Sequence, residues 1–295
     1  MANYSFKREV EVFLVHGGAR YKLDTSDISF DQTFKETSFP VKTLHNQSAV
    51  FESSAITTAN PANFSFSIPA LTEADFTIVE TLLLNTNQFD LFIKNNADTY
   101  KLTGCVITNG SFEIEKTRPL RIGISGQAQQ LQRGQTLTGS LQSRSANRTY
   151  VIPSKVLVQV DGTSVSYVTS LSLELQNDIK WTPYATVNGA RSATTASTTM
   201  YPSSFSLSKK ILSGSITEYL TNVNASANQT WSKTASIEIK AGNGLSGGSF
   251  RGFHFGPATC SFTNRTRTED IFTQSYDWRM IQNPTLSSVL KYETD

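Results

Sequence analysis

The chain has 295 residues, of which 38% are hydrophobic and 17% are charged, and its formal net charge is +2. This length allows one large domain or two of medium size. The shortage of apolar residues, offset by Ser, Thr and Asn, favours exposed β-sheets with long polar loops over a helical bundle. No stretch approaches 18 consecutive apolar residues, the N-terminus lacks the apolar core of a secretory signal, and no basic cluster indicates a nucleic-acid patch.

The sequence contains two cysteines, Cys105 and Cys260. Two are too few for a disulfide framework, and each lies in or beside an apolar strand-like run. We therefore expect both to be buried, reduced thiols in a reducing compartment.

The first part of the chain alternates apolar and polar residues in short runs. Strands are expected at residues 8–15, closed by a turn at Gly17-Gly18, and at residues 21–23 and 28–34. Residues 35–60 are polar, and a structureless loop of that length is uncommon in a compact domain. We expect this segment to form a projecting β-hairpin or a loop ordered by a partner chain, mobile in the monomer and ordered in an assembly.

One short stretch occurs twice. Residues 61–71 (Pro-Ala-Asn-Phe-Ser-Phe-Ser-Ile-Pro-Ala-Leu) and 202–212 (Pro-Ser-Ser-Phe-Ser-Leu-Ser-Lys-Lys-Ile-Leu) begin with proline and then alternate apolar residues with serine. A period of two predicts a strand with one buried and one hydroxyl-bearing face. Similar flanking elements recur in the same order over roughly 120 residues.

This recurrence predicts a tandem duplication. The fold class is then mainly β, with two β-sandwich or half-barrel domains at 1–135 and 151–295, joined by a polar linker at 136–150. Each domain is expected to carry a short flanking helix and a long polar hairpin. The alternative is two unrelated β-domains that share the common turn and strand patterns of β proteins.

The remaining elements follow from local signals. Short helices are expected at 72–83, where acidic residues precede an apolar run, and at 215–223. Asn109-Gly110 predicts a hairpin between strands 99–108 and 111–115. Further strands are expected at 89–93, 120–127, 165–175 and 272–280, with a turn at Asp161-Gly162 and a second extended polar hairpin over 177–201.

A search for catalytic or cofactor signatures is unproductive. Residues 242–247 match G-x-G-x-x-G, but a strand-like run rather than a helix follows, so we expect a glycine hairpin. Glu113 and Glu115 lie two apart on a strand and face solvent together. There is no G-x-S-x-G motif, and we regard the eight N-x-S/T sequons as accidental. We therefore expect no enzyme and no cofactor.

Metal binding is not indicated either. The three histidines, His16, His45 and His254, have no partner histidine or cysteine at ligand spacing. We expect no metal site.

This organisation resembles the tail tube (major tail) proteins of long-tailed bacteriophages, and in particular those of non-contractile siphophage tails whose tube domain is fused in tandem. The resemblance implies a virion structural protein, assembled in the host cytoplasm, whose strands close a β-barrel around a channel for double-stranded DNA. It implies that the helices lie outside the barrel, and that segments 39–56 and 183–199 contact neighbouring subunits, the next ring or other tail proteins. Because the chain is slightly basic, the charge of the channel stays open.

The candidate contact residues are the apolar, aromatic and basic positions of these two segments. They are Phe39, Val41, Leu44, Phe51, Trp181, Tyr184, Arg191 and Tyr201. The alternative function, a carbohydrate- or receptor-binding β-sandwich of a tail tip or cell surface, would need exposed clustered aromatics, for which Trp181, Tyr184 and Tyr201 are the candidates.

The duplication also predicts an oligomeric state. Open sheet edges promote aggregation, and closing a barrel pairs all of them. If one domain supplies one-sixth of the barrel, as single-domain tube proteins do in hexameric rings, three chains close a pseudo-hexameric ring. Heterologous stacking of such rings continues into a tube.

Overall fold

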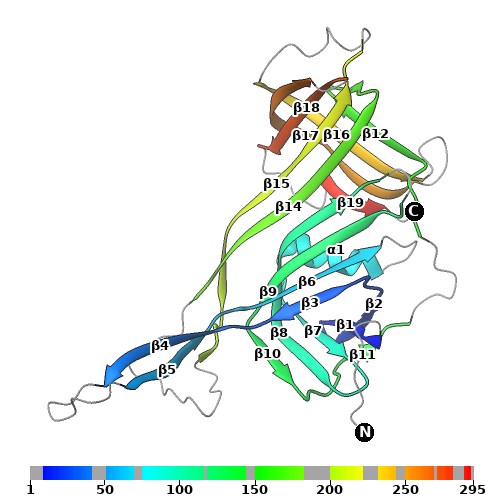
Figure 1. The fold of residues 1–295 in the computed structure, drawn as a ribbon. Helices are drawn as coiled ribbons and strands as arrows, with labels where there is room; N and C mark the ends of the chain where they lie inside the picture. The colour runs from blue at the N-terminus through cyan, green and yellow to red at the C-terminus, as the bar shows by residue number, and fades with distance from the viewer. Residues whose placement is uncertain are drawn as a thin grey trace.

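The computed structural model describes residues 9–41, 51–69, 75–115, 118–143, 150–182, 200–221, 232–243, 250–268, 271–281 and 289–293. These residues form nineteen strands and one helix, so the mainly β prediction is confirmed (Figure 1). None of the described helical residues forms a span long and apolar enough to cross a bilayer.

The first half of the chain builds an antiparallel series in the order β2-β1-β7-β8-β9-β6-β3. Its members are β1 (Glu11–His16), β2 (Ala19–Leu23), β3 (Ile28–Asp31), β6 (Ala62–Pro69), β7 (Phe89–Lys94), β8 (Thr99–Glu113) and β9 (Arg121–Ala128). The β1–β2 turn falls at Gly17-Gly18, as predicted, and both glycines have positive φ angles, which glycine adopts at no steric cost.

The second half repeats this order as β13-β12-β16-β17-β18-β15-β14. Its members are β12 (Lys155–Val160), β13 (Thr163–Ser164), β14 (Val168–Trp181), β15 (Phe205–Tyr219), β16 (Ser232–Asn243), β17 (Arg251–Thr268) and β18 (Phe272–Met280). The pairing even shifts register at the corresponding place, between Phe89 and Leu91 in one half and between Ile237 and Ile239 in the other. The two halves therefore share one topology.

A single joint connects the two series into one sheet. Residues Asn109–Glu113 of β8 pair antiparallel with Ser172–Gln176 of β14. Three short strands extend the sheet: β10 (Gln130–Arg133) on β8, β11 (Ser140–Leu141) on β2 and β19 (Leu290–Glu293) on β17. A separate two-stranded hairpin, β4 (Phe34–Val41) with β5 (Phe51–Ala59), projects from the body as predicted for residues 35–60 (Figure 1).

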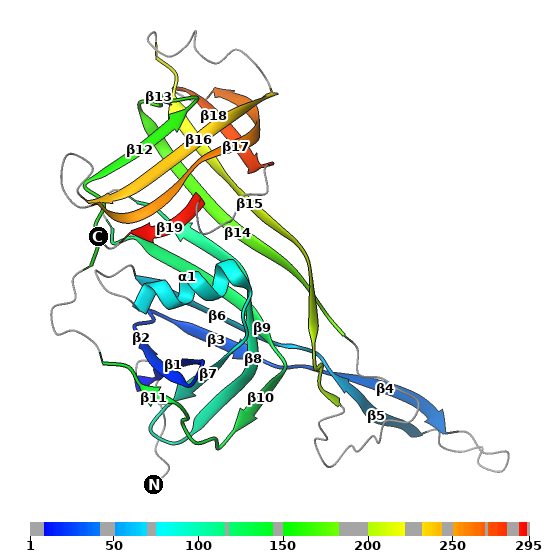
Figure 2. The ribbon, with the colours of Figure 1, turned by 180° about the vertical axis from the view of Figure 1, so that it is seen from behind.

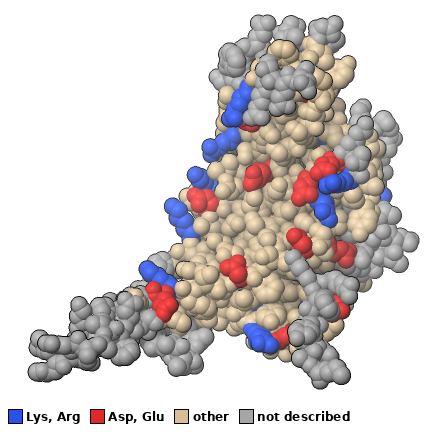
Figure 3. Space-filling view, in the orientation of Figure 1, with Lys and Arg blue, Asp and Glu red and all other residues tan. Residues whose placement is uncertain are grey.

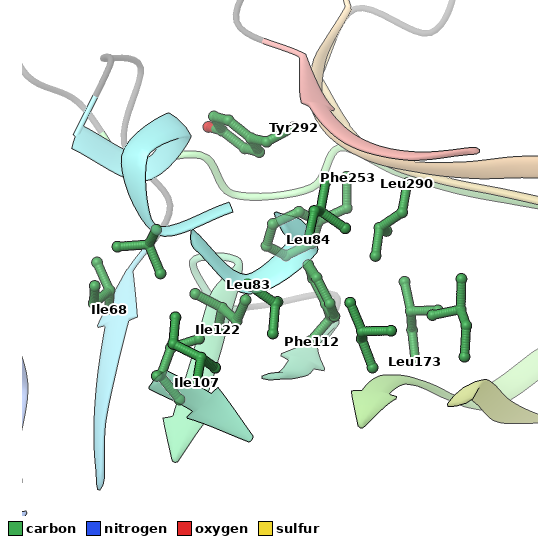
Figure 4. Close-up of a cluster of buried hydrophobic side chains, with 14 of the residues drawn as sticks. Ile68, Leu83, Leu84, Ile107, Phe112, Ile122, Leu173, Phe253, Leu290 and Tyr292 are labelled. Carbon is green, nitrogen blue, oxygen red and sulfur yellow. The ribbon is translucent and has the colours of Figure 1, made fainter. Parts of the chain in front are cut away.

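Helix α1 (Asp75–Asn85) covers one face of the sheet near this joint (Figure 2). Buried side chains of the helix and of strands from both halves meet there, among them Leu83, Phe112, Leu173 and Phe253 (Figure 4). The hydrophobic core is thus continuous across the two halves.

Polar contacts from the second half hold the C-terminal end of this helix. Asn177 Nδ2 donates to the carbonyl oxygens of Leu83 (3.1 Å) and Ile107 (3.0 Å), and Lys210 Nζ donates to that of Leu84. The last carbonyls of a helix have no intrahelical partner, so these side chains satisfy groups that burial would otherwise leave unpaired.

Two sequence predictions are wrong. Asn109-Gly110 is not a turn, because β8 runs unbroken through it; a Cβ at Gly110 would lie 2.4 Å from Leu83 Cδ2, so glycine there makes room for the helix. The helix predicted at 215–223 is absent as far as residue 219, since β15 continues to Tyr219 between β14 and β18.

Other predictions are confirmed. Strand β18 spans the predicted residues 272–280, Asp161-Gly162 forms the β12–β13 turn with positive φ angles, and α1 lies within two or three residues of its expected bounds. Both cysteines are unpaired and buried.

β11 lies inside the segment 136–150 expected to be a linker.

Candidate assembly surface

The face of the sheet opposite α1 is polar over strands of both halves. The buried positions of β6 and β9 alternate with Ser65, Ser67, Ser125 and Gln127. The pattern continues through the joint, where Ser111 of β8 is opposite Glu174 of β14. We call this the hydroxyl face. Ser65 and Ser67, from the first copy of the repeated stretch, are among its members.

In the second half the hydroxyl face continues over β15, β18 and β17. Ser172 Oγ lies 2.9 Å from Ser215 Oγ, and Thr217 Oγ1 lies 3.0 Å from Ser275 Oγ. Ser213 is opposite Arg279, which is opposite Ser261. Short hydroxyl side chains thus run across strand after strand.

Several charges on the hydroxyl face occur in opposite-sign pairs across strands. Arg121 is opposite Glu113, Lys209 is opposite Asp178, and Arg265 Nη2 bonds Asp277 Oδ2 at 2.8 Å. The space-filling view of this side shows several basic residues in a row along the left edge of the upper part and acidic residues mainly on the rest of a mostly uncharged surface (Figure 3). The described part of this face therefore carries charges of both signs.

The sheet has unpaired strand edges at both ends of the described residues. β3 pairs with β6 only, and residues 264–268 of β17 pair with β18 only. Such edges carry free backbone donors and acceptors and accept another strand.

The base of the projecting hairpin is fixed by residues from both halves. Tyr201, only 8% exposed, packs on Ala59 and Met200 and meets the ring of Phe34 edge-on at 6.5 Å. Trp181 packs on Phe205 at 5.5 Å. Two of the predicted contact aromatics are therefore packing anchors within the chain.

Polar bonds reinforce this base. Trp181 Nε1 donates to Gln127 Oε1 (2.9 Å), and Gln129 Nε2 donates to the carbonyl of Ser203 (2.5 Å). Gln32 donates to the carbonyls of Asn60 and Gln129. The base of the hairpin and the chain around residue 201 are thus connected by both packing and hydrogen bonds.

The other predicted contact residues divide into two groups. Phe39 and Val41 lie on β4, and Phe51 lies on β5, with Val41 opposite Phe51. Leu44, Tyr184 and Arg191 lie outside the described residues. Because Tyr201 is buried, the three aromatics proposed for sugar binding do not form an exposed cluster.

An ion cluster missed by sequence reasoning lies on β16, β17 and β19. His254 Nδ1 is 2.9 Å from Glu293 Oε1, and His254 Nε2 is 3.0 Å from Glu238 Oε1. Lys240 and Lys291 bond the same carboxylates at 2.8 and 2.6 Å, and the Lys240 bond is the main cause of a lowered pKa at Glu238. The sequence signal would have been the charged residues at alternate positions of these strands, Glu238 and Lys240 on β16 and Lys291 and Glu293 on β19. The described residues hold no cluster of metal-ligand type.

A second missed group is Glu80 on α1. Its Oε1 accepts a bond from the backbone N–H of Tyr292 on β19 at 3.0 Å. Burial raises the pKa of Glu80 to about 7, against the lowering effects of this bond and of Lys291. The carboxylate thus connects the helix of the first half to the last strand of the second.

The described residues thus present a polar sheet face that runs over both halves, two strand edges without a described neighbour, and a projecting hairpin. The chain belongs to the Bacteriophage Baseplate Tube Protein Family, whose model matches residues 2–86 and 76–292. A comparison with curated proteins gave no match. Membership makes the chain a structural component of a phage tail or baseplate, and hence of the virion, which confirms the predicted class of protein at that level.

Proposed function

We propose that the chain is a tube subunit with two tandem copies of one tube domain, of the kind fused in siphophage tails. Residues 1–135 and 151–295 are the copies, with 136–150 between them. The observation that carries this proposal is the strand order, which is the same in both halves and continuous through the β8–β14 joint.

The β8–β14 pairing indicates which strands would pair between neighbouring chains in a ring. The strand equivalent to β8 in the second half is β17, and the strand equivalent to β14 in the first half is β3. Repeating the β8–β14 joint between chains therefore places β17 of one chain beside β3 of the next. Three chains with six such joints close a barrel with pseudo-sixfold symmetry, and the last open edge disappears.

The hydroxyl face becomes the channel wall in this arrangement, because α1 covers the opposite face (Figure 2). DNA affinity depends mainly on cations that neutralise phosphates. A wall of hydroxyls and paired charges offers few such contacts, so double-stranded DNA passes without being held. In this proposal the channel wall carries balanced charge rather than an excess of acid.

The projecting hairpin serves contacts between rings or with other tail proteins. It lies outside the sheet and carries Phe39, Val41 and Phe51 on its two strands. At its base Ala59 and Phe34 pack against Tyr201, so the hairpin is held by a residue of the second half.

Averaged electron microscopy of the purified full-length protein tests the proposal. We expect rings of three chains with six similar lobes, stacked into tubes with an open channel. Rings of six chains, or a closed twofold dimer that does not stack, would show that the proposal is wrong.

A further inference from the structure

The two halves differ at one sheet edge. On the side of β8 away from β9, β7 covers the first part of the strand and β14 pairs with Asn109–Glu113. On the side of β17 away from β18, β16 continues past the corresponding point, with Thr234 opposite Ser261 and Ser232 opposite Thr263. The place that β14 takes on β8 is thus occupied on β17 by the chain's own residues 232–234.

The register shifts fix this equivalence. Phe89 of β7 corresponds to Ile237 of β16, because each precedes the shift in its pair. Before Phe89 the chain leaves the sheet through α1 and a turn with a positive φ at Thr86. Before Ile237 it stays in the sheet, and we call residues 232–235 of this stretch the edge cover.

We propose that the edge cover blocks ring closure in the free subunit and is displaced when a second copy of this chain adds its β3 to β17. This inference rests on the proposed function. The β8–β14 register then predicts Ser261 opposite Asp31 and Thr263 opposite Ser29 of the neighbouring chain. It also brings Arg265 opposite Asp27, a pair of complementary charge.

The edge cover is weakly held. β12 pairs with residues 237–242 of β16, so within the described part of the chain residues 232–235 have a strand on one side only. Ala235 contributes the one buried apolar side chain that the structure describes within the cover. Replacing the cover by β3 exchanges one antiparallel ladder for another, so backbone hydrogen bonds are conserved.

A hinge position marks where displacement would stop. Ser236 N–H donates to Asp161 Oδ1 at 2.8 Å, and Asp161 N–H donates to the Ser236 carbonyl at 2.8 Å. These bonds tie Ser236 to the β12–β13 turn. Residues before Ser236 can leave β17 while the rest of β16 keeps both neighbours.

A disulfide lock tests the edge cover directly. Ala235 is opposite the native thiol of Cys260, so Ala235→Cys places two thiols on neighbouring strands facing the same side. Oxidised glutathione converts the two thiols to a disulfide. We expect the oxidised variant to remain monomeric, and reduction to restore rings and tubes seen by negative-stain microscopy. The control is Ala235→Cys with Cys260→Ser, which cannot form the lock.

Hydrogen exchange of the wild-type chain gives a second, independent reading. We expect residues 232–235 to be protected in the monomer and to lose protection in tubes, while residues 27–31 gain it. Tubes that form equally well from the locked variant, or unchanged exchange at 232–235, would overturn the edge cover and leave the tube function standing. Failure of wild-type chains to form rings at all would instead reject the proposed function.

Discussion

The two halves share a strand order but differ in the segment that precedes β7 in the first half and β16 in the second. In the first half this segment is α1, whose end is held by Asn177 and Lys210, and the freed edge of β8 accepts β14. In the second half the segment stays in the sheet and covers β17. The same topology thus gives a closed joint inside the chain, at β8, and a covered strand edge at β17. Whether the preceding segment leaves the sheet or stays in it decides whether the edge can pair with another strand.

The largest effect is expected from breaking the closed joint at Asn177, which is 2% exposed. Asn177→Leu leaves the buried carbonyls of Leu83 and Ile107 without their donor. We expect a loss of about 2–4 kcal/mol in the free energy of unfolding, measured by urea titration. Gln176→Ala, one residue away on the exposed hydroxyl face, should change it by less than about 0.5 kcal/mol. Equal effects of the two would contradict this role of Asn177.

Next in size is a pH dependence from Glu80, the contact between α1 and β19. Its pKa is raised to about 7 by burial, above the ordinary 4.5, so the neutral form is favoured in the folded state. The stability from this group is therefore complete below pH 4.5 and is lost as the pH rises through 7.

Glu80→Gln should remove this dependence. At pH 8 we expect the variant to unfold with a free energy about 2 kcal/mol higher than the wild type, and at pH 4.5 the two should be nearly equal. Glu115→Gln, an exposed carboxyl in an ion pair with Arg118, is the matched control. A variant that tracks the wild type at both pH values would refute the assignment.

The smallest effect on stability, and the sharpest on function, is expected on the hydroxyl face that both halves share. Ser111→Lys with Ser213→Lys should change the free energy of unfolding by less than about 0.5 kcal/mol per site. It should, however, give tubes a salt-dependent affinity for double-stranded DNA. Ser→Gln at the same positions keeps the face neutral and should bind no more DNA than wild-type tubes in a filter-retention assay.

Local signals in the sequence were sufficient for most strands. The turns at Gly17-Gly18 and Asp161-Gly162 and the alternating serines of residues 61–71 predict what the structure shows. Residues 205–212 form the predicted strand, but Leu207 is 38% exposed, so the predicted buried face is wrong at that position. Asn109-Gly110 misled because this glycine serves packing against Leu83 rather than a turn. Residues 215–219 misled because two neighbouring strands override a weak helical pattern.

The site was less predictable, because its key contacts join distant residues. The β8–β14 joint pairs residues about 60 apart in sequence, and neither strand carries a local signature of its partner. Asn177 and Lys210 donate hydrogen bonds to backbone carbonyls of α1, and no sequence pattern predicts these contacts. Trp181 and Tyr201 were recognised as aromatics beside a hairpin, but their contacts with Gln127 and Ala59 of the first half depend on the tertiary fold.

The β8–β14 joint also lowers the free-energy cost of assembling a ring from separate chains. Bringing two separate chains together costs several kcal/mol in translational and rotational freedom, on the order of 4–15 kcal/mol per association. In the proposed ring of three tandem chains, each folded subunit already contains one joint, so three of the six joints exist before assembly and this loss is met for three chains rather than six. A covalent link therefore lowers the concentration at which rings begin to form, and it guarantees that first-half and second-half domains alternate around the circle.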